Sequence, residues 1–158
     1  MGKSAMPLIL KNPYALKEFV GKEIGVTEWF RLSQERIEQF AQATEDRQWI
    51  HLDRARAVRE SPYGGTIAHG FLTLSLIAHF VREAMRIESG LRLAVNYGLN
   101  RVRFPAAVRA EWRIRGRVGL LACKEMSDSL EAIYSVAVEI EGAEKPGCVA
   151  EWIVRYYV

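Results

Sequence analysis

The chain of 158 residues carries a formal net charge of +3, and 49% of its residues are hydrophobic while 26% are charged. This length suits a single domain over residues 1–158, and the composition allows a packed core and argues against global disorder. The weak positive charge favours an anionic ligand, but without a recognisable nucleic-acid-binding module it argues against nucleic acid as a partner.

The cysteines and the N-terminus limit the class of protein and the cellular compartment that are expected. Cys123 and Cys148 form no CxxC pair, so neither a disulfide framework nor a zinc site is expected. The opening MGKSAMPLIL lacks a long apolar core and a small-residue cleavage site, so residues 1–12 are expected to form an arm instead of a signal peptide. No run of about 18 uncharged apolar residues occurs, so no membrane span is expected. Together these features predict a cytoplasmic protein.

The N-terminal third predicts short alternating elements. Residues 13–20, PYALKEFV, favour a short helix that Gly21 ends. The β-forming residues of GVTEWFRLS, 25–33, predict a strand. Ser33 is then a suitable N-cap for the helix QERIEQFAQAT, whose apolar residues recur at helical spacing and which should fray near Thr44.

The middle of the chain predicts one buried helix. After DRQWIHLD, residues 46–53, Asp53 can cap a short helix, and SPYGGTIAHG, 61–70, predicts a loop. From Phe71 the sequence FLTLSLIAHFV is apolar on almost every side, which is typical of a buried helix. Its continuation is amphipathic, and Gly90 can end it.

The remainder of the chain predicts strands. Four segments show alternating apolar and polar residues or runs of β-branched and aromatic residues: 91–104, 109–121, 130–140 and 147–158. Short turns between consecutive strands favour an antiparallel sheet. The sequence therefore predicts an α+β fold in which the sheet curls around one long central helix.

Asp46 and His51 in DRQWIHLD are the first candidates for catalysis. They would point about 140° apart on a helix and to opposite faces on a strand. Only a turn or an irregular segment brings them together, and a carboxylate beside an imidazole can then orient and deprotonate one water. The structural alternative is that Asp46 caps the next residues while His51 makes a buried hydrogen bond.

The segment TIAHGF, 66–71, leads directly into the predicted buried helix. Backbone N–H groups at a helix start lack intrahelical partners and lie at the positive end of the helix dipole, so they can stabilise an enolate oxygen. Gly70 would let a ligand approach its N–H closely, while His69 either donates to a ligand or makes a cap or buried hydrogen bond. Gly64 and Gly65 are expected only to serve turns.

Arginines alternate with other residues on two predicted strands. Arg101 and Arg103 share one strand face, and Arg113, Arg115 and Arg117 share another. A solvated polar face accounts for both sets. The alternative is an anion site, because guanidinium groups suit phosphates.

Taken together, FAQATEDRQWIHLD and SPYGGTIAHGFLTLSLI resemble the MaoC-like hydratases, which include the (R)-specific enoyl-CoA hydratases. Their motif has an Asp, then x-Asn-Pro-aliphatic-His, a nearby Asp and later a [PT]-[IV]-[AV]-H-G loop. Asp46, His51 and residues 66–70 match it in order and spacing, and the resemblance covers roughly residues 28–157. Gln48-Trp49 replaces the family's Asn-Pro, which is closer to the nodulation protein N-like branch and leaves the substrate open.

The resemblance implies a hot-dog fold and a homodimer with active sites at the subunit interface. It also implies reversible syn addition of water to a trans-2-enoyl-CoA, giving an (R)-3-hydroxyacyl thioester, with no metal and no redox cofactor. Two alternatives remain open, a hot-dog acyl-CoA thioesterase and a non-catalytic acyl-binding or signalling module.

The resemblance also assigns roles to residues. Asp46 and His51 would hold one water, with Asp46 favoured as base and His51 as orienting partner and proton donor. The N–H of Gly70 would bind the thioester oxygen, and the rest of this substrate-binding loop comprises Thr66, Ala68 and His69. Arg101 and Arg103 are the candidates for contacts with the phosphates of coenzyme A.

Overall fold

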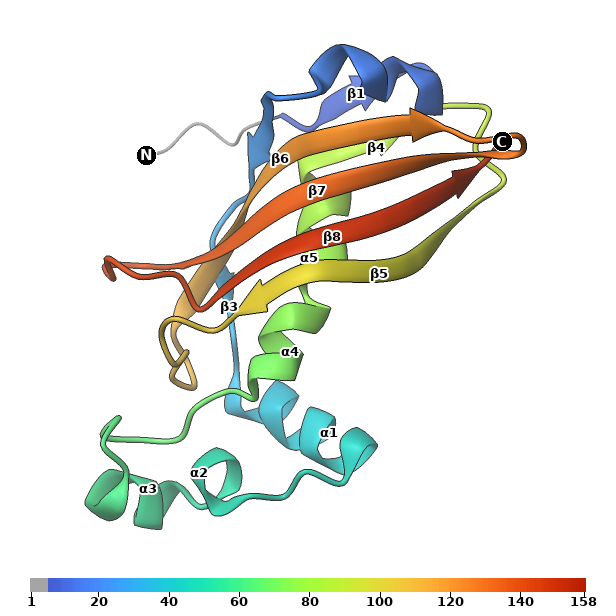
Figure 1. Cartoon of the computed structure of the whole chain (residues 1–158). Helices are drawn as coiled ribbons and strands as arrows, with labels where there is room; N and C mark the ends of the chain where they lie inside the picture. Colours follow the sequence, from blue (N-terminus) through green and yellow to red (C-terminus); the bar gives the residue numbers. More distant parts are fainter. Residues whose placement is uncertain (1–5) are drawn as a thin grey trace.

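The computed structural model describes residues 6–158, in which a β-sheet covers one helix and a lobe of short helices extends from one end (Figure 1). The strands are β1 (Leu8–Leu10), β2 (Glu23–Val26), β3 (Phe30–Arg31), β4 (Met85–Ile87), β5 (Leu93–Arg103), β6 (Arg113–Glu125), β7 (Ser129–Ile140) and β8 (Cys148–Tyr157). The helices are the 3-10 helix η1 (Pro13–Phe19), α1 (Gln34–Thr44), α2 (Trp49–Leu52), α3 (Arg54–Glu60), α4 (Gly70–Ser75) and α5 (Ile77–Ala84).

The main sheet has the strand order β2-β6-β7-β8-β5, and β3 also pairs with β6. All of these pairs are antiparallel. β5 precedes the other long strands in the chain but pairs with β8, so it is the last strand at one edge. The four predicted C-terminal strands and their antiparallel pairing are therefore confirmed. The parallel pair of β1 and β4 is an addition that the pattern did not predict.

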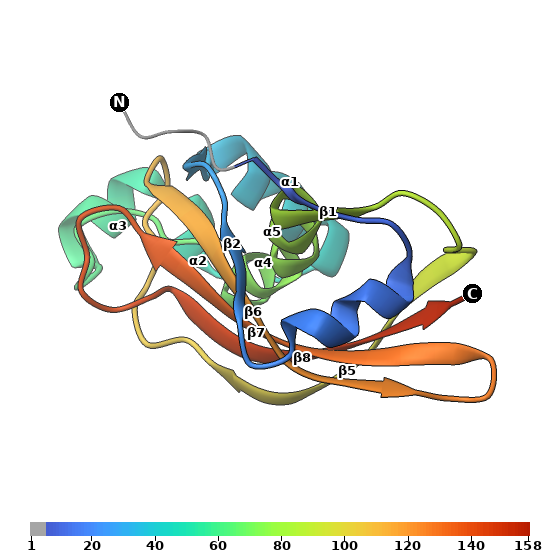
Figure 2. The ribbon, with the colours of Figure 1, turned by 90° about the horizontal axis from the view of Figure 1, so that it is seen from above.

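The inner face of the sheet packs against α5. Along β6, the buried residues Ile114, Val118 and Leu120 alternate with more exposed ones. Phe80 of α5 lies so close to this strand that a Cβ at Gly116 would be 2.4 Å from the Cβ of Phe80, which leaves room only for glycine. Figure 2 shows the sheet curving beneath α4 and α5. This is the predicted α+β arrangement of a sheet wrapped around a helix.

The predicted single central helix is corrected to two helices, α4 and α5, with Leu76 between them. The hydroxyl of Ser75 at the end of α4 donates to the carbonyl of Phe71 at 2.7 Å, and the N–H of Leu76 still donates to the carbonyl of Leu72 at 3.2 Å. Phe71 is 69% exposed, so the first turn is not buried on every side. The expected amphipathic extension toward Gly90 is also wrong, because the backbone turns extended at Met85 and forms β4.

The N-terminal elements form near their predicted positions, but some differ in type from the prediction. The segment 13–20 forms a 3-10 helix, and the predicted strand 25–33 is divided between β2 and β3. Ser33 caps α1 as expected, since its Oγ accepts a hydrogen bond from the N–H of Arg36 at 3.3 Å. Within the predicted arm, residues 1–5 lie outside the described residues, while β1 pairs with β4. None of the helices in residues 6–158 combines the length and apolar character needed to cross a bilayer.

Candidate active site

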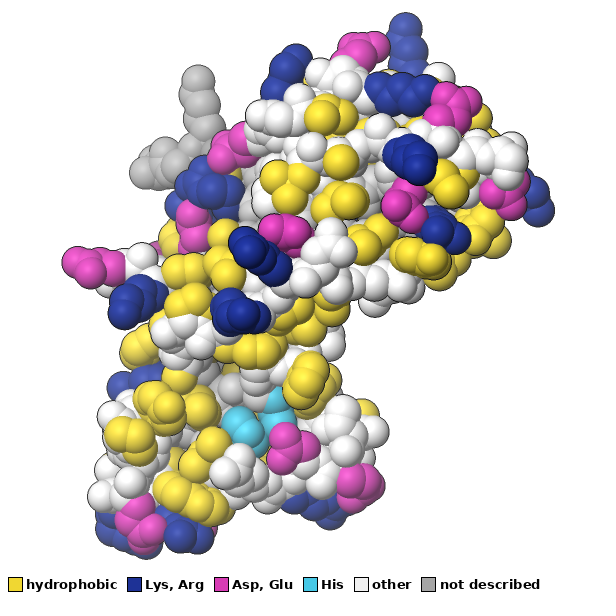
Figure 3. All heavy atoms as spheres, in the orientation of Figure 1, with side chains coloured by type: hydrophobic (Ala, Val, Ile, Leu, Met, Phe, Trp, Pro, Cys, Tyr) yellow, Lys and Arg dark blue, Asp and Glu magenta, His cyan; other side chains and the backbone are white. Residues whose placement is uncertain are grey.

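The two predicted catalytic side chains meet where the sheet body joins the helical lobe. Asp46 lies in an irregular segment after α1, whereas His51 lies in the one-turn helix α2. The expectation of an irregular turn is therefore right for Asp46 and wrong for His51. Figure 3 shows histidine side chains beside a carboxylate at this junction. Because α2 begins after Asp46, Asp46 and His51 do not lie on one helix. The divergent side-chain directions expected on a shared helix therefore do not arise, and the two side chains can approach each other.

A third residue, His69, completes the cluster. Asp46, His51 and His69 each offer one oxygen or nitrogen atom, and these atoms lie within 4.8 Å of one another. A water that makes hydrogen bonds of about 2.8 Å can bridge two such atoms. A metal ion suits the cluster less well, because the imidazole rings are stacked with centroids 3.7 Å apart and planes 25° apart. Their lone pairs lie in nearly parallel planes and do not converge on one ion.

Hydrogen bonding determines which nitrogen of His51 is free. Nδ1 lies 2.7 Å from the carbonyl oxygen of Ile67, and a carbonyl only accepts, so Nδ1 carries the proton. In the neutral ring Nε2 is then an acceptor. Burial is the largest cause that lowers the pKa of His51 below 6.5, and the nearby His69 lowers it further, against the bond to Ile67 and the charge of Asp46. The neutral form is therefore favoured near pH 7.

His69 holds the backbone of Asp46. Its Nε2 donates to the carbonyl oxygen of Asp46 at 2.9 Å, while a carboxylate oxygen of the same residue lies 4.0 Å away. The ring is almost completely buried, and its Nδ1 has no partner within residues 6–158. The sequence left two roles for His69, donation to a ligand or a cap or buried hydrogen bond. The structure shows the buried hydrogen bond.

Gly70 opens α4 beside two exposed aromatic rings. As the first residue of the helix, it has an N–H without an intrahelical partner. A Cβ at this position would lie 3.2 Å from the ring of Phe104, so a side chain would displace that ring. Phe104 and Phe71 are both exposed, and their rings meet edge to face with centroids 6.3 Å apart. The surface beside Gly70 is thus aromatic.

Two residues predicted to bind substrate have their polar groups engaged within the protein. The N–H of Ala68 donates to the carbonyl of Val108 at 2.7 Å. The hydroxyl of Thr66 donates to the side chain of Gln34 at 2.5 Å. Both residues are buried, and these hydrogen bonds support the loop that carries His69 and Gly70.

Gln34 is the residue of the site that sequence reasoning missed. Its amide is 2% exposed and, besides accepting from Thr66, donates to the carbonyl oxygen of His51 at 2.8 Å. The available signal was periodicity, since Gln34 shares a helix face with the buried Ile37 and Ala41. A polar side chain on an apolar face requires a partner inside the protein.

The backbone explains how Gln48-Trp49 replaces Asn-Pro. Trp49 is the first residue of α2, the helical position that proline favours. Gln48 before it has φ −58° and ψ 136°, an extended conformation of the kind that precedes proline. Trp49 is also held by Arg56, whose guanidinium lies 4.2 Å from the ring centroid. The turn that carries His51 therefore forms without proline.

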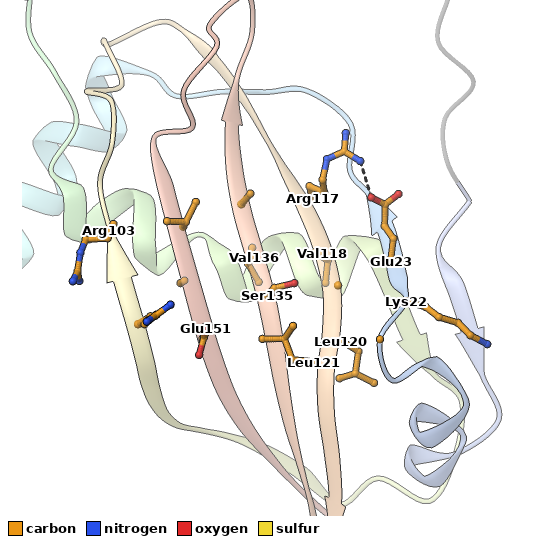
Figure 4. Close-up of a pocket in the computed structure, with 16 residues that line it drawn as sticks. Lys22, Glu23, Arg103, Arg117, Val118, Leu120, Leu121, Ser135, Val136 and Glu151 are labelled. Carbon is orange, nitrogen blue, oxygen red and sulfur yellow. Dashed lines mark hydrogen bonds and ion pairs between the residues drawn. The ribbon is translucent and has the colours of Figure 1, made fainter.

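Arg101 and Arg103 lie apart from the histidine cluster. They line a groove of about 680 Å³ on the outer face of the sheet, with Lys22, Arg117, Glu23 and Glu151 (Figure 4). Neither arginine forms an ion pair within the described part of the chain. Arg113, Arg115 and Arg117 instead bond to glutamates at 2.7 to 3.0 Å, which confirms the solvated polar face for that set.

The chain is similar over most of its length to known dehydratases and nodulation proteins. The family model described as MaoC like domain matches residues 16–140. The 3-hydroxyacyl-thioester dehydratase Z of Mycobacterium tuberculosis is 44% identical over 137 residues, which is 86% of this chain and 89% of that protein. The Nodulation protein N of Rhizobium leguminosarum bv. viciae is 45% identical over 135 residues, 85% of this chain and 84% of that protein.

Solved structures support the fold at low sequence identity. The (R)-hydratase from A. caviae involved in PHA biosynthesis superposes with a TM-score of 0.69 at 21% identity, covering 85% of this chain and 94% of that one. The monoamine oxidase regulatory protein from Archaeoglobus fulgius reaches 0.75 at 20% identity, covering 97% and 98%. The predicted hot-dog fold is thereby confirmed.

Proposed function

Because the chain belongs to the MaoC-like dehydratase family, we propose that this hydro-lyase adds water to trans-2-enoyl-CoA and yields an (R)-3-hydroxyacyl-CoA. The observation that carries the proposal is the pairing of the Asp46 carboxylate with a neutral His51 within reach of one water. The Gly70 N–H at the start of α4 supplies the remaining requirement, a donor for the thioester oxygen.

The hydrogen bond to Ile67 favours His51 as the base, where the sequence had favoured Asp46. Nε2 of His51 accepts a proton from the water while the water oxygen bonds to C3 of the enoyl thioester. The electron pair of the double bond moves to the thioester oxygen and forms an enolate. The imidazolium then returns the proton to C2, so one water is added in total. The carboxylate of Asp46 orients the water and stabilises the imidazolium.

Gly70 and its aromatic neighbours would place the thioester. The Gly70 N–H donates to the thioester oxygen, whose negative charge is greatest in the enolate, so this bond strengthens as the reaction proceeds. Phe71 and Phe104 would flank the chain of the substrate at the same point. An apolar entrance reduces access of bulk water to the enolate, which favours protonation by the imidazolium.

The phosphates of coenzyme A are assigned to Arg101 and Arg103. Both guanidinium groups lack an ion pair in residues 6–158, and although Arg103 donates to the carbonyl of Val102 at 2.7 Å, further donors remain for an anion. Arg103 is followed directly by Phe104, whose ring packs against Gly70. Arg103 would therefore hold an anion one residue away in the chain from the ring that contacts Gly70.

A homodimer would pair two copies along β5. This strand is the last at its edge of the sheet, and its residues are exposed along nearly the whole length, including Leu93, Val95, Tyr97 and Leu99. A long exposed edge with apolar side chains is a template for pairing with another strand. Among the structural relatives, HadBC and ChsH1-ChsH2 of Mycobacterium tuberculosis were solved as complexes.

Hydration of crotonyl-CoA tests the proposed function. Loss of the enoyl thioester absorbance, with (R)-3-hydroxybutyryl-CoA as the product on chiral analysis, is the expected result. Asp46→Asn and His51→Ala should each lower kcat by about 10²- to 10⁴-fold. Glu45→Gln removes a neighbouring exposed carboxylate and should leave kcat unchanged. Wild-type protein that hydrates neither crotonyl-CoA nor longer enoyl-CoA thioesters would overturn the proposal.

A second candidate rests on the similarity to Nodulation protein N, which equals that to the dehydratase. In this case the fold binds acyl thioesters without turning them over. Calorimetry with a saturated acyl-CoA, run beside the hydration assay, separates the two functions. Tight binding together with an absent hydration rate for every chain length favours the binding module.

A further inference from the structure

The geometry points to Gln34 as a positioning residue that holds the two catalytic segments together, an inference that rests on the proposed hydratase function. The first segment is α2, which carries His51. The second is the stretch Thr66–Gly70, which carries His69 and the N–H of Gly70. Gln34 belongs to neither, since it is the first residue of α1.

The amide of Gln34 makes one hydrogen bond to each segment. Nε2 donates to the carbonyl oxygen of His51 at 2.8 Å, and Oε1 accepts from the hydroxyl of Thr66 at 2.5 Å. The carbonyl of His51 can only accept, so the two bonds fix the orientation of the amide. All three groups are buried, and removing the amide would leave two polar groups without partners.

Ile67 links the same two segments next to the amide. Its N–H donates to the carbonyl of Ile50 at 3.1 Å, and its carbonyl accepts from Nδ1 of His51 at 2.7 Å. The hydrogen bond that orients the His51 ring therefore joins α2 to the stretch Thr66–Gly70. If the segments move apart, the Nδ1 bond lengthens, and both the ring orientation and the choice of tautomer are lost.

Gln34 is itself held by Glu111, a residue with a strained backbone conformation. The N–H of Gln34 donates at 3.0 Å to the carboxylate of Glu111, which has φ 72°. The left-handed region is unfavourable for glutamate, so this conformation persists because surrounding bonds maintain it. The N–H of Glu111 also donates to the carbonyl of Leu32 at 2.8 Å. The start of α1 is thus anchored to the loop before β6, and Gln34 extends from that anchor into the site.

A positioning role predicts a specific kinetic pattern. In Gln34→Leu the volume is nearly kept but both bonds are lost, so kcat with crotonyl-CoA should fall about ten- to hundredfold while KM changes less than threefold. Thr66→Val removes only the bond to Thr66 and should lower kcat less. The double variant should be little worse than Gln34→Leu alone, because both changes remove the same link. Gln39→Leu, the same substitution at an exposed position of α1, serves as control.

A second readout does not depend on catalysis. In protein with ¹⁵N-labelled histidine rings, wild-type His51 should show one tautomer, protonated at Nδ1. In Gln34→Leu its ring signals should shift toward a mixture of tautomers, while those of His79 on α5 stay unchanged. Where Gln34→Leu does not fold, Thr66→Val carries the same comparison.

The two readouts separate the possible failures. Folded Gln34→Leu, or Thr66→Val in its place, with wild-type kcat and an unchanged His51 spectrum overturns the positioning role. Wild-type protein without hydratase activity overturns the proposed function instead, and the ring signals still report whether Gln34 holds the two segments together.

Discussion

Nδ1 of His51 donates to the carbonyl oxygen of Ile67 across 2.7 Å, between two segments that are 16 residues apart in the chain. One bond thereby sets the tautomer, the ring orientation and the free nitrogen of the histidine proposed as the base. The same ring is buried and stacked on His69, which keeps it neutral. The lowered pKa of His51 should be measurable in the pH dependence of activity and of stability.

Activity should decline on the acid side of neutrality. The pKa of His51 is lowered from 6.5, chiefly by burial, and the proposed mechanism requires the neutral ring. We expect kcat/KM for crotonyl-CoA to be constant above pH 7 and to fall as the pH drops through the lowered pKa. An acid limb centred at or above pH 7 would contradict this assignment.

Stability should change in the same pH window. Below pH 6.5, His51 is protonated in the unfolded chain but still neutral in the folded chain, because its folded pKa is lower. The free energy of unfolding therefore decreases as the pH falls toward the folded pKa. Urea unfolding of wild type and His51→Gln at pH 7.5, 6.5 and 5.5 measures the effect. The variant should show a flatter dependence, and equal slopes would argue against a buried neutral imidazole.

Gly70 should tolerate no side chain. A Cβ would meet the ring of Phe104 at 3.2 Å and narrow the approach to the N–H, so Gly70→Ala should lower kcat/KM by at least about tenfold. Gly65→Ala is the matched control. Its Cβ would meet only the guanidinium of Arg109, at 2.9 Å, and that flexible side chain can move away. Comparable losses in both variants would mean that loop stability, and not access to the N–H, is affected.

Arg101 and Arg103 should influence substrates that carry phosphates. Arg101→Ala and Arg103→Ala are each expected to raise KM for crotonyl-CoA roughly two- to tenfold, with KM for crotonyl-N-acetylcysteamine unchanged because that thioester has no phosphate. Arg82→Ala, on the exposed face of α5, provides the control. Equal effects on both thioesters would remove the phosphate assignment.

Trp49→Pro should be accepted by the backbone. Gln48 already has the extended conformation that a following proline requires, so α2 and hydratase activity should be kept within about threefold. Ile50→Pro, one residue later, forces Trp49 out of the helix and should greatly reduce folding or activity. Circular dichroism and kcat of the two variants make the comparison.

An exposed leucine on β5 should control assembly. Leu99→Lys places a charge along the edge proposed to pair with a second copy, and sedimentation should show a shift from dimer to monomer. Leu121→Lys alters a similarly exposed leucine on β6, away from that edge, and should leave the dimer intact. A monomeric wild type would contradict the proposed assembly.

Local patterns predicted the parts of the fold that local forces determine. The strands from residue 91 onward and the caps at Ser33 and Asp53 follow from alternation and from side-chain hydrogen bonding within four residues. The break at Leu76 was not predictable from hydrophobicity, because apolar residues continue on both sides of it, at Leu74 and Ile77. The β1–β4 pair needs contact between residues far apart in the chain, which short-range patterns do not report.

The candidate site was also predictable only in part from the sequence. Spacing identified Asp46 and His51, but it could not show that α2 begins between them or that Ile67 selects the tautomer. Thr66 and Ala68 were placed correctly in the loop, yet their bonds to Gln34 and Val108 exist only in three dimensions. Motif reasoning therefore identified the loop, and only the coordinates show which of its polar groups are bonded within the protein.

The interruption at Leu76 also separates two evolutionary constraints. α5 is confined by the contact of Phe80 with Gly116, so most changes there would cost stability. In α4, Gly70 lies against Phe104, and Leu72 and Thr73 are buried, whereas Phe71 is exposed, so substitutions of Phe71 should have less effect on the core. Among relatives of this protein, position 71 should therefore vary more than position 80, and under the proposed function directed evolution toward new acyl chains should begin at Phe71.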